Sequence, residues 1–157
     1  MNSELLRKIA DRIERYPDSY DQNTYGRAEE GCGTVCCIAG HTLIESGYIP
    51  AKLCFDLSIV YIRPVPLGSS KVSSVLMYYF DIAKEAKELL DLTDEEEYLF
   101  SPHWRPRNGQ SVADALREMA ETDKLVTNLT DVYTDPFPKV EEDGFCRHHQ
   151  FATTWDD

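Results

Sequence analysis

The sequence predicts a mainly α, single-domain helical fold around a buried central helix, with at most a short β element. The length of 157 residues and the 42 % hydrophobic content are typical of a chain that buries a sizeable core. Several stretches place apolar residues at helical spacing, and one of them is apolar on all sides. We assign 1–157 to one domain and expect 131–157 to be an acidic, weakly structured C-terminal tail.

The first predicted helix covers residues 3–16. Ser3 is its predicted N-cap, and Pro17 ends it because proline lacks the backbone N–H. Residues 17–33 are rich in turn-forming Asp, Ser, Asn and Gly, which predicts a polar loop. The inner face of the helix is given by residues spaced three or four apart: Leu5, Leu6, Ile9, Ala10, Ile13 and Tyr16.

The central helix is predicted over residues 34–46. Thr34 is its predicted cap, and Gly47 is suited to the position just beyond its last turn. The stretch lacks a polar face, which favours a place in the middle of the domain. Ala39 and Gly40 would let a neighbouring backbone approach this helix closely.

The second half of the chain predicts one extended segment followed by more helices. Residues 55–65 are rich in Ile, Val and Tyr and read as extended, although no partner strand is evident. The longest helix is predicted over 71–91. Thr93 and Glu96 have the spacing of a capping box that opens a short helix, and Ser111 begins the last helix.

The charge balance excludes several classes of function. Sixteen Lys and Arg against 28 Asp and Glu give a net charge of −12, which disfavours binding to nucleic acid or to an anionic membrane. No apolar run approaches the ~20 residues of a membrane span, and the first residues lack the pattern of a signal peptide. Five cysteines, an odd and small number, indicate reduced thiols and a cytoplasmic location. No cofactor is expected.

Two acidic stretches, 81–99 and 131–157, carry most of the excess negative charge. One interpretation is a solvated helix face and a solvated tail. The other is a surface that imitates the phosphate spacing of nucleic acid or docks on a basic protein patch, for which Glu85, Glu88 and Glu96 are the candidate interaction residues. On the second interpretation the chain is a non-catalytic, acidic protein-binding module whose partner is a protein with a basic surface.

Residues 32–41 read Cys-Gly-Thr-Val-Cys-Cys-Ile-Ala-Gly-His. This run resembles a group of small uncharacterised bacterial and phage proteins that share the motif Cys-Gly-Thr-x-x-Cys-x-Ala-Gly. In those proteins a Leu-x-Leu-Thr-x-x-Glu helix follows, which matches residues 90–96 here, and the resemblance extends over about 3–120. It implies a shared fold but no activity, and it makes a phage- or mobile-element-derived inhibitor one form of the binding function.

The same motif leaves two chemical alternatives open. A zinc site would take Cys32, Cys36 or Cys37, and His41, with a fourth ligand from Cys146, His148 or His149. A cysteine-dependent enzyme would use Cys32 as nucleophile near a helix N-terminus and His41 as base, although the spacing does not choose between His41, His103 and His148 as the base.

Against both stands a structural role. In it Cys36 and Cys37 pack in the core, Cys32 lies at the junction of loop and helix, and His41 hydrogen-bonds to a core carbonyl or carboxylate. We favour the structural role.

Overall fold

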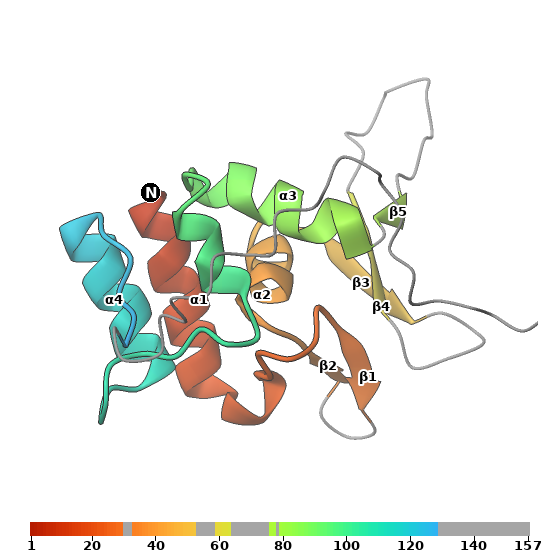
Figure 1. Ribbon diagram of the computed structural model, residues 1–157. Coiled ribbons are helices and arrows are strands. Elements are labelled where there is room, and N and C mark those ends of the chain that lie inside the picture. The colour runs from red at the N-terminus through yellow and green to blue at the C-terminus, as the bar shows by residue number, and fades with distance from the viewer. Residues whose placement is uncertain (30–32, 53–58, 64–75, 78, 129–157) are drawn as a thin grey trace, which may run out of the picture.

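Helices and short strands are mixed along the chain in the structure, which is a computed structural model (Figure 1). It describes residues 1–29, 33–52, 59–63, 76–77 and 79–128. The predicted acidic tail, 131–157, lies outside these residues. In chain order the elements are α1 (Ser3–Arg15), the 3₁₀-helix η1 (Pro17–Ser19), β1 (Arg27–Glu29), β2 (Gly33–Val35), α2 (Ile38–Glu45), β3 (Ile49–Lys52), β4 (Ile59–Ile62), β5 (Leu76–Met77), α3 (Tyr79–Leu90), the 3₁₀-helix η2 (Glu96–Phe100) and α4 (Val112–Thr122).

The prediction of a mainly α fold is wrong, because the described residues include two antiparallel sheets. β1 pairs with β2, and β4 lies between β3 and β5. The extended segment predicted over 55–65 is a strand at Ile59–Ile62, and its partners come from sequence on either side. One partner, Leu76–Met77, lies inside the helix predicted over 71–91, and the helix begins only at Tyr79. Residues 71–75 lie outside the described part of the chain.

Pairing between distant residues explains this difference. Ile49 is opposite Ile62, and Tyr61 is opposite Met77. β3 contains Pro50, which is depleted in strands, and β5 is only two residues long, so neither carries a strong local strand signal. Tertiary pairing therefore decides their structure rather than propensity.

α2 lies at the centre of the fold, in contact with α1 and α3 (Figure 1). It is buried on all sides over Ile38–Leu43, as its composition predicts, but it is shorter than the predicted range 34–46. Thr34 does not cap it, because Thr34 is in β2, and Cys37 is the N-cap residue. Gly33 has φ +80°, which suits the turn of a hairpin rather than a helix.

α1 and α4 lie side by side, with α1 between α4 and the central helix α2 (Figure 1). The N-cap of α1 is Asn2 rather than Ser3: its side-chain oxygen accepts a hydrogen bond from the Leu5 N–H at 3.2 Å. α4 starts as predicted, with the Ser111 hydroxyl oxygen accepting from the Asp114 N–H at 3.1 Å. The face that α1 buries consists of Leu5, Leu6, Ile9, Ala10 and Ile13.

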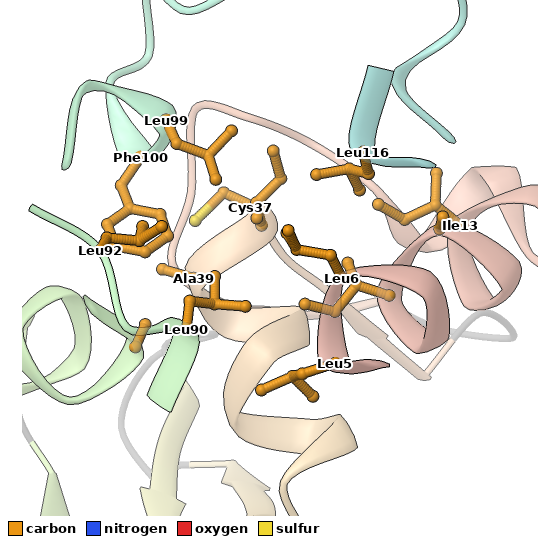
Figure 2. Packing of buried hydrophobic residues seen from close by; sticks show 14 of the residues in the cluster. Leu5, Leu6, Ile13, Cys37, Ala39, Leu90, Leu92, Leu99, Phe100 and Leu116 are labelled. Atoms are coloured by element: carbon orange, nitrogen blue, oxygen red, sulfur yellow. The ribbon is translucent and has the colours of Figure 1, made fainter. Parts of the chain in front are cut away.

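One hydrophobic cluster joins all four helices to η2 and β4. Figure 2 shows Cys37 in its middle, among leucines that come from α1, from η2 and from the end of α3. Trp104 is fully buried as well, and its indole N–H donates to the Val126 carbonyl oxygen at 2.9 Å. Across the described ranges, no helix has the length and apolar character that a membrane crossing requires.

Candidate functional site

The cysteine–histidine motif enters the core. Cys36 and Cys37 are 0 % and 1 % exposed, and both are free thiols. Burial disfavours the thiolate and raises the pKa of Cys36 to about 12 and that of Cys37 to about 11. The backbone N–H groups of Gly40 and Ala39 at the start of α2 lower the pKa of Cys37, but their influence does not outweigh burial. Both side chains are therefore neutral thiols at pH 7.

His41 is fully buried one turn after Cys37. Its Nε2 lies 3.1 Å from the Ser19 carbonyl oxygen, and because a carbonyl can only accept, Nε2 carries the proton. The same carbonyl oxygen accepts the Cys36 N–H at 2.9 Å. Burial, then the nearby positive charge of Arg12, lower the pKa of His41 to about 4. The imidazole is neutral at pH 7 and ties the loop after α1 to the central helix.

This arrangement favours a structural role for Cys36, Cys37 and His41. A cysteine hydrolase needs an accessible thiolate, and so a lowered thiol pKa, beside a histidine whose pKa lies near the working pH. Here burial instead raises the pKa of Cys37 and lowers the pKa of His41. In the part of the chain that the structure covers, no three His, Cys, Asp or Glu side chains are grouped to hold a metal ion. Cys32 lies outside the described residues, as do the predicted fourth zinc ligands in 146–149.

The three predicted interaction residues have different environments. Glu85 accepts hydrogen bonds from the Tyr48 hydroxyl and from Arg63, and its side chain is only 18 % exposed. Glu96 belongs to the predicted capping box: its carboxylate accepts the Thr93 N–H at 2.8 Å. Glu88 points into solvent. Of the three, Glu88 alone is an exposed carboxylate without a structural contact among the described residues.

A groove beside η2 holds acidic residues that the sequence analysis did not select. Three carboxylates line it, Asp94, Glu95 and Glu97, all of them exposed. The groove has a volume of about 550 Å³, and much of its remaining wall is aromatic: Tyr25, Tyr98 and Phe100.

Lys87 lies between two of these carboxylates. Its Nζ pairs with Asp94 and, at 3.1 Å, with Glu97. Asp94 has its pKa lowered by the hydrogen bond and the charge of Lys87. Glu95 has no ion-pair partner within the described residues. Two of the carboxylates therefore already bind an ammonium group, that of Lys87, and the groove keeps a net negative charge.

Sequence reasoning could find one side of this groove but not the other. The run Thr-Asp-Glu-Glu-Glu-Tyr over 93–98 combines a capping signal with clustered acids and an aromatic ring. Tyr25 comes from the loop before β1, some seventy positions earlier, and no local pattern connects it to that run.

Comparisons with known proteins yield no similarity: no protein-family model, no curated protein and no solved structure matches this chain.

Proposed function

We propose that this chain is a non-catalytic, acidic protein-binding module whose partner presents a basic surface. Its contact surface, which we name the acidic face, consists of Glu88, Asp94, Glu95 and Glu97. These residues lie near the end of α3 and at η2. The observation that carries the proposal is the charge imbalance there: in the described structure these four carboxylates, with the neighbouring Asp91, outnumber two lysines, the paired Lys87 and the exposed Lys84.

The physical argument is electrostatic complementarity. Exposed carboxylates that outnumber the cations near them create a negative potential, which attracts a basic partner and orients it during encounter. The net charge of −12 adds to this attraction. The same negative charge repels nucleic acid and anionic membranes, so we propose a protein as the partner.

The module is proposed to act in the cytoplasm, where free thiols such as Cys36 and Cys37 stay reduced. An inhibitor carried by a phage or mobile element would fit this chemistry, since an acidic surface can cover a basic functional surface of a host protein. That form of the function rests on the resemblance of residues 32–41 to bacterial and phage proteins.

Charge reversal tests the proposal. The variant Glu88→Lys/Glu95→Lys changes two exposed side chains for which the structure gives no hydrogen bond or ion pair. Glu85 and Glu96 are left intact, because reversing them would break the Tyr48–Arg63 contacts and the Thr93 cap. The matched control, Asp18→Lys/Glu121→Lys, makes the same change in net charge at exposed positions outside the acidic face.

The measurement is the set of proteins captured from a host extract by each variant, across a series of salt concentrations. We expect the parent and the control to retain a basic protein that the acidic-face variant loses. That retention should weaken as the salt rises above about 0.1 M, where the screening length falls to about 10 Å. If both variants retain the same proteins with the same salt dependence, the acidic face is only a solvated surface and the proposal is wrong.

A further inference from the structure

The groove beside η2 has both aromatic side chains and carboxylates in its lining. Three aromatic residues, Tyr25, Tyr98 and Phe100, and three carboxylates line it together. Phe100 is 4 % exposed, and Tyr25 and Tyr98 are half-buried, so these side chains belong to a packed wall rather than to projecting loops. Its volume of about 550 Å³ falls within the range of sites that receive a side chain or small ligand.

We propose that this groove receives an arginine side chain from a basic segment of the partner protein. The inference rests on the proposed function and deepens it, because it names the group that the acidic face recognises. Charge complementarity selects a cation, since Asp94, Glu95 and Glu97 line the groove. The aromatic wall then selects among cations.

Arginine fits such a wall better than lysine does. A guanidinium group is planar, so it stacks on an aromatic ring while its N–H groups donate to a carboxylate. It is also more weakly hydrated than an ammonium group, which lowers the cost of entering an apolar hollow. Lysine offers one compact, strongly hydrated charge that needs no aromatic wall.

Lys87 supplies an internal comparison. Its ammonium group already pairs with Asp94 and Glu97 from the side of the neighbouring hollow, which it lines together with Glu88. These two carboxylates therefore hold a cation in the free protein. An incoming guanidinium group would share them or displace Lys87, so Lys87 acts as a competitor that limits the affinity of the groove.

The test uses two labelled Gly/Ser peptides of equal charge, one bearing arginines and the other lysines. Binding is measured by fluorescence anisotropy at low salt, with the full chain and with the variants Tyr98→Leu, Lys87→Met and Glu95→Gln. Glu121→Gln is the control, since it removes one exposed carboxylate of α4, away from the groove. Thermal unfolding of each variant checks that the fold is intact.

We expect the arginine peptide to bind about two- to fivefold more tightly than the lysine peptide, the ratio that a cation–π contact at an exposed site supplies. Tyr98→Leu should remove that ratio while leaving some affinity for both peptides. Lys87→Met should tighten binding of both peptides, and Glu95→Gln should weaken it more than Glu121→Gln does.

The outcomes separate this inference from the proposed function. Equal binding of the two peptides, with Glu95→Gln still weaker than the control, would overturn the arginine site and leave the acidic face in place. If Tyr98→Leu does not fold, unchanged binding in Lys87→Met overturns the inference by itself. Equal effects of Glu95→Gln and Glu121→Gln on both peptides would contradict the acidic face as well.

Discussion

Gly40 packs so closely on Tyr25 that a Cβ at position 40 would lie 2.4 Å from the Tyr25 carbonyl oxygen. The same Cβ would lie 2.5 Å from the Tyr61 hydroxyl oxygen and 2.5 Å from the Cβ of Cys36. The Tyr61 hydroxyl donates to the Tyr25 carbonyl oxygen at 2.7 Å, so these groups are fixed to one another. The central helix can approach the loop before β1 only because residue 40 has no side chain.

Gly40→Ala should therefore destabilise the fold, by about 1–3 kcal/mol or more, since overpacking forces backbone to move. Chemical denaturation measures the change. Gly109→Ala is the matched control: Gly109 has φ +79° and no atom within 4 Å of an added Cβ, so only backbone strain of about 1–2 kcal/mol applies. A Gly40→Ala protein as stable as the parent would contradict the close packing at this point.

The stability of the protein should fall as the pH drops from 7 to 5, because His41 is buried in its neutral form. Its pKa is lowered from 6.5 to about 4, so the unfolded chain binds the proton first and proton uptake favours unfolding. The contribution of neutral His41 to the free energy of unfolding is complete above pH 6.5 and is lost progressively as the pH falls toward 4. The groups that lie near the imidazole, the positive Arg12 and the neutral Tyr20, offer it no negative charge at these pH values.

Between pH 7 and pH 5 the expected loss is about 2 kcal/mol, from the 1.36 kcal/mol that each pKa unit represents. Urea titrations at several pH values measure it. His41→Gln keeps a donor toward the Ser19 carbonyl and should flatten this part of the profile, whereas His103→Gln, at an exposed position, should not. An unchanged slope in His41→Gln would assign the pH dependence to other groups.

Leu43→Ala should lower the free energy of unfolding by about 2–5 kcal/mol, as large-to-small changes in a packed core do. Leu43 lies on α2 and is 0 % exposed. Arg15→Ala, at an exposed position on α1, should stay within about 0.5 kcal/mol. Denaturant midpoints compare the two, and a harmless Leu43→Ala would show that α2 is not central.

Cys36 and Cys37 should resist alkylation in the native protein. Both are buried, and their raised pKa values leave almost no thiolate at pH 7. Iodoacetamide labelling followed by peptide mass spectrometry should find both unmodified until denaturant is added, when both should react. Rapid native labelling of Cys37 would instead contradict its burial and its raised pKa, and with them the structural role of this thiol.

Local signals predicted the helical elements well where capping and amphipathic spacing agree. The Ser111 cap of α4 and most of the inner face of α1 follow from side-chain spacing and from hydrogen bonds within a few residues. Tyr16, which the spacing also placed on that face, lies just beyond the helix and is 54 % exposed. The Thr93–Glu96 capping box is reciprocal, as its spacing predicts, with a second hydrogen bond of 3.3 Å from the Glu96 N–H to Thr93 Oγ1. Such contacts close over three or four residues, so a short stretch of sequence contains all of the information.

The sheets and the groove depend on contacts between residues far apart in the chain. β5 becomes a strand because Met77 pairs with Tyr61, and the groove forms because Tyr25 lies beside the turn that carries Asp94. The same limit affects single side chains: Glu85 and Glu88 look alike in an acidic helix, but Arg63 and Tyr48 bind the first and leave the second in solvent. Which of two such residues is paired depends on tertiary packing, because the free energy of each contact depends on a partner that lies far away in the sequence.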